Sequence, residues 1–431
     1  MIRSLSLVRF KNFEKATLRL GPLTVLIGAN ASGKSNIRDA FLFFHGIGRG
    51  YSLAEILGEK YVGGERIWSG IRGGTREVAY SGSHEFGLGL DLDVELQRPK
   101  NPGPHRLSYA VNVTLSGPAD RPPHILSESL SYKTTPLFKD KQYIDRNNLK
   151  VVFWKQKGVV KGRYPPTGTY FSGTPIISQV SDGDEARIRG VRFWCRTVLQ
   201  RLQSFRFLDL SPTQMRIPSL PGQTALGDRG ENLSSVLLAI CENASRKEAL
   251  LEWVRKLTPM DVEDFKFEPD AAGRILLKIE EKSGRIVSAA SASDGTLRFL
   301  AVLAALFGPT PASFYFIEEL ENGIHPSRLG LLVELIENQT KRRAIQVVAT
   351  SHSPQLLQFL SQESLEHASL AYRLPDHPAA QIKRIVDIPN ARRVIKEQPV
   401  SILHASSWFE DVLDFAEGGE TEPVTEGQPA S

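Results

Sequence analysis

Residues 28–35, GANASGKS, place two glycines, a lysine and a serine in the order G-x-x-x-x-G-K-[ST]. Small residues let successive backbone N–H groups curve around a phosphate, and the N-terminus of a following helix adds the positive end of its dipole. In this pattern the Lys34 ammonium reaches the β- and γ-phosphates of a nucleotide, while the Ser35 hydroxyl suits Mg²⁺. The pattern therefore predicts a site for ATP and Mg²⁺. The residues expected to contact the nucleotide are Asn30, Ala31, Ser32, Gly33, Lys34, Ser35 and Asn36.

Two adjacent glutamates, Glu318 and Glu319, end the short apolar run FYFI at residues 314–317. Adjacent carboxylates repel each other and are costly to bury without partners. In a nucleotide site, Mg²⁺ and the lysine of the phosphate loop supply compensating charge. We therefore expect Glu318 to bind the metal and Glu319 to act as the general base for the attacking water. A solvated acidic loop accounts for Glu321, two residues on, but not for a buried strand that ends in this pair.

Two further segments could complete the same site. His352 follows the apolar run AIQVVATS, where an imidazole can reach a γ-phosphate, although a lone histidine is more often a loop or core residue. Residues 291–298, SASDGTLR, set Ser293 and Gly295 before a strongly apolar helical pattern. The N-terminus of such a helix binds anions, but many helices begin with a serine or aspartate cap that has no ligand.

These side chains need a scaffold that brings distant segments together. The run PLTVLIG predicts a buried strand before the phosphate loop, and residues 34–46 have the apolar spacing of a helix. A chance Gly-rich turn does not explain this context. Strand and helix patterns alternate in the C-terminal half, which predicts a parallel sheet. From about residue 65 to 180, glycines and prolines separate alternating segments typical of antiparallel strands. Residues 187–260 predict helices, and no heptad pattern persists.

Composition limits the class of protein. The 431 residues contain only Cys195 and Cys241, too few for a disulfide framework and not in a metal-binding spacing. The N-terminus has no signal-peptide pattern, and no apolar run approaches the roughly 20 residues that span a bilayer. We therefore expect a soluble, cytoplasmic protein without a membrane partner. The net charge of +5 includes four glutamates in residues 417–431, a segment expected to be disordered.

Taken in order, these motifs resemble the ABC-type ATPase heads of the RecF, structural-maintenance-of-chromosomes (SMC) and OLD-nuclease group. The segment PLTVLIGANASGKSN resembles the group's Walker A strand and loop, and FYFIEELENGIHP resembles its Walker B strand and D-loop. SASDGTLRFLAVLAAL resembles its signature motif, and ATSHSP resembles its switch histidine. The resemblance implies that Glu319 and His352 act in ATP hydrolysis. It also implies that Ser293 and Gly295 of one head close over the ATP of a second, so that ATP drives a homodimer or higher oligomer.

The sequence departs from the family pattern at three points. Glu318 stands where the family has aspartate, which lengthens the reach to Mg²⁺ by one methylene. Asp294 replaces the first glycine of the LSGGQ signature of membrane transporters, which argues against a transporter subunit. The glutamine of the family's Q-loop has only candidates here, Gln142 and Gln156.

The resemblance implies an α/β fold class: an ABC-type P-loop NTPase head with an antiparallel β-subdomain and a helical insertion, without a long coiled coil. The expected organisation is a head at 1–416, with its nucleotide-binding core at 1–60 and 260–390, a β-rich subdomain at 61–186, a helical subdomain at 187–259, and an acidic tail at 417–431.

Two functions agree with these motifs. OLD nucleases continue into a Toprim domain with an Asp-x-Asp motif, and no such motif appears among the 79 residues after His352. The chain therefore resembles stand-alone ATPases of bacterial anti-phage defence, such as the PARIS ATPase AriA. Such an ATPase is a nucleotide-switched sensor and scaffold with a separate effector protein, a nuclease or a toxin. The alternative is a RecF-like ATP-dependent DNA clamp that acts in repair.

Two basic segments make nucleic acid a possible partner. The segment from Lys133 to Arg163 contains nine Lys or Arg residues and two acidic residues. The segment from Arg187 to Arg206 contains six Arg residues and no acidic residue. Aromatic residues are interleaved with both, an arrangement that suits phosphate backbones and exposed bases. A solvated face of a β-subdomain with core aromatics explains the same composition equally well.

Overall fold

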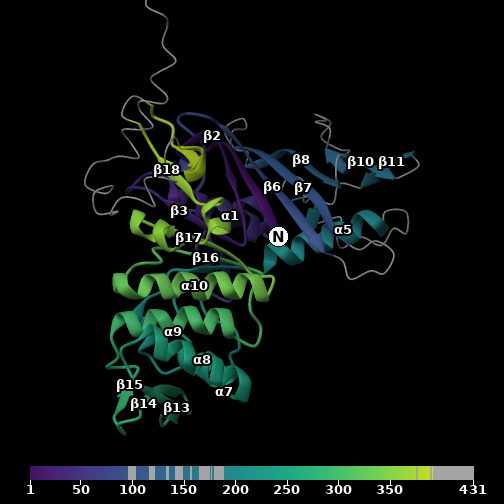
Figure 1. Ribbon diagram of the computed structural model, residues 1–431. Helices are drawn as coiled ribbons and strands as arrows, with labels where there is room; N and C mark the ends of the chain where they lie inside the picture. Colours follow the sequence, from purple (N-terminus) through teal and green to yellow (C-terminus); the bar gives the residue numbers. More distant parts are fainter. Residues whose placement is uncertain are drawn as a thin grey trace, which may run out of the picture.

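The structure is a computed structural model with two large sheets, helix α1 (Lys34–Gly48) packed between them, and a helical end that carries a small sheet (Figure 1). The described residues are 1–95, 103–115, 122–132, 135–140, 149–155, 158–164, 175, 177–178, 189–374, 377–388 and 391. The side chains of residues 135–164 and 189–190 lie outside this description, as does the predicted tail at 417–431.

The central sheet has six strands in the order β12-β16-β17-β3-β18-β19. Its first five strands are parallel, and only the edge strand β19 runs antiparallel to its neighbour. Strands with both faces covered read as continuous apolar runs, and every residue of β3, β16 and β17 is buried. The predicted parallel sheet is confirmed. The bounds are β3 (Leu23–Ile27), β12 (Phe205–Leu208), β16 (Phe314–Ile317), β17 (Gln346–Ser351), β18 (Ser369–Tyr372) and β19 (Gln381–Arg384).

The second sheet has eight strands in the order β11-β10-β9-β8-β7-β6-β1-β2, and each pair of neighbours is antiparallel. The predicted antiparallel region is therefore confirmed, and the two N-terminal strands join it. The bounds are β1 (Ile2–Phe10), β2 (Phe13–Arg19), β6 (Glu85–Glu95), β7 (Pro104–Thr114), β8 (His124–Tyr132), β9 (Thr135–Asp140), β10 (Leu149–Lys155) and β11 (Gly158–Tyr164).

Helix α1 (Lys34–Gly48) packs against both sheets. The Phe41 ring lies 4.8 Å from the ring of Phe314 in the central sheet. On another side of the helix, Phe43 lies 5.7 Å from Phe86 in the antiparallel sheet. A helix that is apolar all round is buried on all sides, and the run AFLFF gives α1 this property. Helix α5 (Arg189–Gln203) packs on α1 from the outside.

The lower end of the molecule in Figure 1 is a stack of helices below the central sheet. Helix α10 lies next to the sheet, with α9, α8 and α7 beyond it and a three-stranded sheet at the tip. The bounds are α7 (Leu233–Cys241), α8 (Ala244–Leu257), β13 (Val262–Pro269), β14 (Ile275–Glu281), β15 (Ile286–Ser288), α9 (Asp294–Phe307) and α10 (Pro326–Arg342).

Short elements connect these parts. They are α2 (Leu53–Leu57), β4 (Lys60–Val62), β5 (Glu65–Trp68), α3 (Gly74–Glu77), α6 (Pro212–Met215), η3 (Pro354–Phe359), α11 (Gln362–Leu365) and η4 (Ile385–Asp387). Strand β12 lies inside the stretch predicted as helical, because a four-residue strand between helical patterns is too short to distinguish by periodicity. Both cysteines are free thiols. Among the described residues, no helix combines the length and apolarity needed to cross a membrane.

Candidate functional site

The phosphate loop connects the end of β3 to the start of α1. Gly33 is the residue before α1, with a φ of 108° that strongly favours glycine. A Cβ at Gly33 would lie 2.7 Å from the Phe13 ring, and one at Gly28 would lie 2.2 Å from the carbonyl oxygen of Ala371. The loop therefore has room for glycine alone at both ends. Its backbone leads directly into the first turn of α1, where the N–H groups of Asn36 and Ile37 donate to the carbonyl oxygen of Gly33 at 2.9 and 3.1 Å.

Lys34 is buried at the centre of this loop. Its Nζ donates to the carbonyl oxygens of Gly28 at 2.5 Å and Ala29 at 2.8 Å, and it lies 3.3 Å from Nδ1 of His352. Burial lowers the pKa of Lys34 to about 8, while the carboxylates of Glu321 and Glu319 act in the opposite direction. The ammonium thus has loop carbonyls as partners, and phosphate oxygens can replace them.

Glu319 and His352 face each other at the C-terminal edge of the central sheet. Oε1 of Glu319 lies 3.6 Å from Nε2 of His352. The Glu319 backbone has a φ of 49°, and its N–H donates to Oγ1 of Thr350 at 3.0 Å. Asn322 donates to the second carboxylate oxygen of Glu319 at 3.1 Å. The structure therefore brings the predicted base and the predicted switch histidine to the same place as Lys34.

Glu321 is also part of this site, and its interpretation as a solvated loop residue is wrong. Its Oε1 accepts the backbone N–H of His352 at 2.6 Å. Its Oε2 is buried and has no hydrogen-bond partner among the described residues. Glu321 also exerts the largest of the electrostatic effects that raise the pKa of Lys34. The sequence signal was its spacing of three residues from Glu318, which a turn can fold back toward the sheet.

Glu318 follows the last residue of β16 and forms an ion pair with Arg38 of α1. Its Oε1 is 2.7 Å from Nε of Arg38. Burial raises the pKa of Glu318, and Arg38 lowers it. Leu208 of β12 pairs with Ile317 of β16, so the next residues, Asp209 and Glu318, lie at equivalent positions of neighbouring strands. The charge of Asp209 also raises the pKa of Glu318.

The donor set fits a Mg²⁺-nucleotide. No group of three or more His, Cys, Asp or Glu that could hold a metal occurs among the described residues. Mg²⁺ in nucleotide sites keeps waters and phosphate oxygens and takes only one or two protein ligands, and Ser35 with Glu318 would supply these. Ser32 has a buried hydroxyl without a hydrogen-bond partner in the described part of the chain, which is free to donate to a phosphate.

The predicted signature residues lie apart from this loop. Ser293 is exposed and caps α9, because its hydroxyl accepts the N–H of Thr296 at 3.2 Å. Figure 1 shows α10 between α9 and the strands β16 and β17. A Cβ at Gly295 would lie 2.5 Å from the carbonyl oxygen of Gly323 in the loop after β16. Within one chain, the structure brings Gly295 to the D-loop and does not bring Ser293 to Lys34.

Asn12 is a site residue that the sequence reasoning did not single out. It lies in the turn between β1 and β2, where Lys11 has a φ of 55°. Its Oδ1 accepts from Nδ2 of Asn36 at 2.7 Å. The first hairpin therefore rests on the start of α1. The only sequence signal was the turn-forming Lys-Asn pair between two strand patterns.

A family model described as "AAA domain, putative AbiEii toxin, Type IV TA system" matches residues 23–153 and 200–358. The chain belongs to this AAA family. The matched ranges of this AAA protein include the phosphate loop, the acidic end of β16 and His352. The α/β fold and the phosphate loop between β3 and α1 agree with the AAA domain of this family, and they confirm the α/β P-loop fold predicted from the sequence.

Solved structures similar to this AAA protein include three SMC heads. The crystal structure of the SmcHead bound to the C-winged helix domain of ScpA has a TM-score of 0.48 and 13% identity, and the match covers 89% of this chain and 97% of that one. The SMC head domain from Thermotoga maritima has a TM-score of 0.41 and 12% identity, and the match covers 89% of this chain and 98% of that one. The Smc head domain with an extended coiled coil, bound to the C-terminal domain of ScpA from Pyrococcus furiosus, has a TM-score of 0.40 and 12% identity. That match covers 92% of this chain and 98% of the other. No curated protein matches the chain in sequence.

The basic segment of the AAA protein between Arg187 and Arg206 contributes aromatic rings to the packing of the molecule. Phe205 is fully buried and lies 4.4 Å from the Phe314 ring. Trp194 stacks on Tyr132 at 5.1 Å. The Phe205 ring is therefore not available to stack on a base, and Tyr132 covers one face of the half-buried Trp194 ring. The side chains of Lys133–Arg163 and both Q-loop candidates, Gln142 and Gln156, lie outside the described residues.

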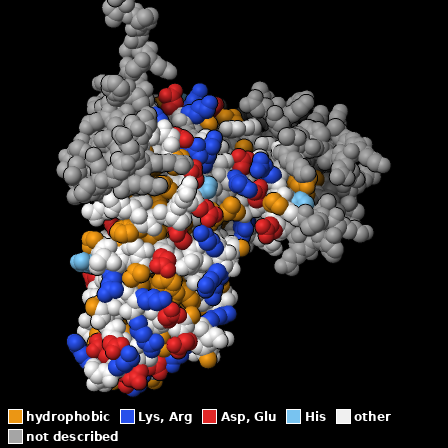
Figure 2. Space-filling view, viewed as in Figure 1, with side chains coloured by type: hydrophobic (Ala, Val, Ile, Leu, Met, Phe, Trp, Pro, Cys, Tyr) orange, Lys and Arg blue, Asp and Glu red, His pale blue; other side chains and the backbone are white. Residues whose placement is uncertain are grey.

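Surface charge on the helical end is mixed. Figure 2 shows blue and red side chains interspersed over the region of α8 and β13–β15. Ion pairs join Lys266 to Glu280 at 2.7 Å and Lys256 to Glu252 at 2.6 Å. This visible face therefore presents no single-sign surface for a polyanion.

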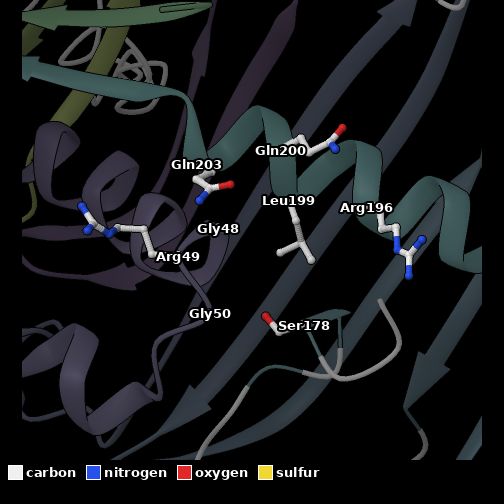
Figure 3. A pocket seen from close by; sticks show the side chains of 8 residues that line it. All are labelled: Gly48, Arg49, Gly50, Ser178, Arg196, Leu199, Gln200 and Gln203. Atoms are coloured by element: carbon white, nitrogen blue, oxygen red, sulfur yellow. The ribbon is translucent and has the colours of Figure 1, made fainter. Parts of the chain in front are cut away.

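A hollow of about 250 Å³ lies at the opposite end of α1 from the phosphate loop. Figure 3 shows it between the end of α1 and helix α5. It is lined by Gly48, Arg49, Gly50, Ser178, Arg196, Leu199, Gln200 and Gln203. The lining has no carboxylate, histidine or thiol, so it lacks the groups of a catalytic site.

Proposed function

We propose that this protein binds ATP with Mg²⁺ and hydrolyses it at the site around Lys34. The observation that carries this proposal is the contiguity of Lys34, His352 and Glu319. The Lys34 ammonium lies 3.3 Å from one nitrogen of the His352 ring, and the Glu319 carboxylate lies 3.6 Å from the other. Lys34 would bind the β- and γ-phosphates, Ser35 and Glu318 would hold Mg²⁺, and the metal would supply charge neutralisation.

The imidazole orients the proposed base. A lysine ammonium can only donate hydrogen bonds, so Nδ1 of His352 must accept and Nε2 must carry the proton. The Nε2–H then points toward the carboxylate of Glu319. This arrangement directs the carboxylate of Glu319 toward the space above Lys34, where a γ-phosphate and an attacking water would meet. When ATP binds, the same Nε2–H can donate to a γ-phosphate oxygen.

ATP is proposed to switch the protein between separate and associated copies. Ser293 is exposed and separated from Lys34 of its own chain by α10. The signature loop therefore satisfies γ-phosphate oxygens only when a second copy supplies it. A ligand shifts an equilibrium through its differential affinity for the two states. ATP would thus stabilise the association, and hydrolysis would release it.

The biological setting proposed is anti-phage defence, as a sensor and scaffold for a separate effector similar to the PARIS AriA group. The description of the matched family names a toxin and a Type IV TA system, which supports a defence setting. The effector would be a nuclease or toxin protein that the scaffold releases or activates when its nucleotide state changes.

Two substitutions test the chemistry. Lys34→Ala should abolish nucleotide binding, because it removes the charge that faces the phosphates. Glu319→Gln should retain binding and stop phosphate release, because the amide cannot accept the proton of water. Lys15→Ala and Glu334→Gln, at exposed positions on β2 and α10, serve as matched controls. Normal hydrolysis by Glu319→Gln removes Glu319 from the role of base, and normal binding by Lys34→Ala overturns the proposed site.

A further inference from the structure

Arg38 connects the phosphate helix to the carboxylate assigned to the metal. It lies one helical turn after Lys34, so both side chains project from the same face of α1. Its Nε is 2.7 Å from Oε1 of Glu318, although the N–H does not reach hydrogen-bond geometry. Its guanidinium also lies 5.5 Å from the centre of the Phe207 ring. A cation of the protein itself therefore sits against Glu318.

A second carboxylate offers Arg38 an alternative partner. Asp39 is fully buried, and its Oδ2 accepts from the Arg72 guanidinium at 3.1 and 3.2 Å and lies 3.7 Å from Nζ of Lys11. Its Oδ1 is buried without a hydrogen-bond partner among the described residues, and it lies 3.9 Å from a terminal nitrogen of Arg38. An acceptor that is buried and unfilled is unfavourable. A small movement of Arg38 would fill it.

We propose that Arg38 is a two-position residue that competes with Mg²⁺ for Glu318. Arg38 neutralises Glu318 before Mg²⁺-nucleotide binds, and it transfers to Oδ1 of Asp39 when Glu318 serves the metal. The inference rests on the proposed role of Glu318. Two cations close to one carboxylate repel each other, so Arg38 must leave for Glu318 to act as a metal ligand. Arg38 thereby sets the Mg²⁺ concentration at which nucleotide binds.

The competition is tested by titrating Mg²⁺ at a fixed concentration of a fluorescent ATP analogue, without measuring hydrolysis. Loss of a charge-assisted contact to Glu318 in Arg38→Gln should lower the half-saturating Mg²⁺ concentration about tenfold. Arg19→Gln is the matched control, because it removes the same charge at an exposed position at the end of β2. Its half-saturating Mg²⁺ concentration should stay within about twofold of the wild type.

Further variants separate this mechanism from a general effect of charge or folding. Arg38→Lys keeps the charge and should give an intermediate Mg²⁺ requirement. In a Glu318→Gln background, Arg38→Gln should no longer change the half-saturating Mg²⁺ concentration, because the carboxylate for which Arg38 and Mg²⁺ compete is absent. A wild type whose nucleotide binding is independent of Mg²⁺ overturns the proposed function. Mg²⁺-dependent wild-type binding with an unchanged or raised requirement in Arg38→Gln overturns the role of Arg38 alone.

Discussion

The backbone N–H of His352 donates to the carboxylate of Glu321 at 2.6 Å, across 31 residues of sequence. The contact ties the loop after β16 to the end of β17. The same carboxylate faces the ammonium of Lys34 closely enough to raise its pKa. Glu321 therefore positions the histidine and supports the charge of the lysine, two groups that the proposed chemistry requires.

Replacement of Glu321 should separate these two effects. Glu321→Gln keeps an oxygen that can accept from His352, while Glu321→Ala removes both acceptor and charge. Loss of the charge-assisted hydrogen bond costs about 1.5–3 kcal/mol, so kcat for ATP should fall about tenfold or more in Glu321→Ala and less in Glu321→Gln. Steady-state phosphate release measures both, with Glu334→Ala on the exposed face of α10 as control. Equal, wild-type rates in the two variants contradict the positioning role.

The pKa of Lys34 predicts that nucleotide affinity depends on pH. Burial lowers this pKa from 10.5 to about 8 in the free protein. Below pH 8 the ammonium is already charged, whereas above pH 8 the neutral amine must gain a proton before it pairs with phosphate. The affinity should therefore fall as pH rises above 8, by up to about tenfold per unit. Calorimetry at pH 8.5 in buffers of different ionisation enthalpy should show proton uptake on binding. Binding without proton exchange would contradict the lowered pKa.

The core of the site could be predicted from the sequence because its signals are local. The phosphate loop needs glycine, lysine and serine at fixed spacing, and the apolar run at 314–317 became a strand with those same bounds. The parallel sheet then places the ends of β3, β16 and β17 at one edge. This geometry follows from strand direction alone.

Glu321, Arg38 and Asn12 could not be assigned from the sequence because their partners are distant in the chain. Glu321 reaches the site only because the backbone turns at Glu319, which has a φ of 49°. The ion-pair partner of Arg38 is Glu318, 280 positions later in the sequence, and a charged residue on a helix is usually solvated. Phe205 lies in a segment predicted as basic and helical, but it begins β12, a buried strand of the central sheet.

The close approach of Gly295 to the D-loop gives a stability prediction. A methyl group at Gly295 would lie 2.5 Å from the backbone oxygen of Gly323, which cannot rotate away. Gly295→Ala should lower the free energy of unfolding by about 1–3 kcal/mol through overpacking. Urea unfolding measures this, with Ser291→Ala in the exposed loop before α9 as control. A stability equal to that of the wild type would show that the two loops separate readily.

Nucleic-acid binding remains a prediction for the basic strands. If β10 and β11 contact a phosphate backbone, affinity should fall steeply between about 50 and 200 mM salt through counterion release. Lys155→Glu and Lys161→Glu should weaken binding, while Lys15→Glu on β2 should not. Fluorescence anisotropy with duplex and single-stranded DNA and RNA, in the presence of ATP, measures this. Absence of binding favours the solvated face, and DNA-stimulated ATP hydrolysis would favour the RecF-like clamp.

The central claim is that ATP makes copies of this protein associate through the signature loop. Sedimentation velocity of Glu319→Gln, with and without ATP and Mg²⁺, tests it most directly, because the variant should hold ATP without turnover. The account predicts a larger species only with ATP. It also predicts that adding Ser293→Arg abolishes the larger species while ATP binding to the single chain persists. Ser283→Arg, at an exposed turn between β14 and β15, should leave association intact. A sedimentation coefficient that responds to neither ATP nor Ser293→Arg would contradict the account.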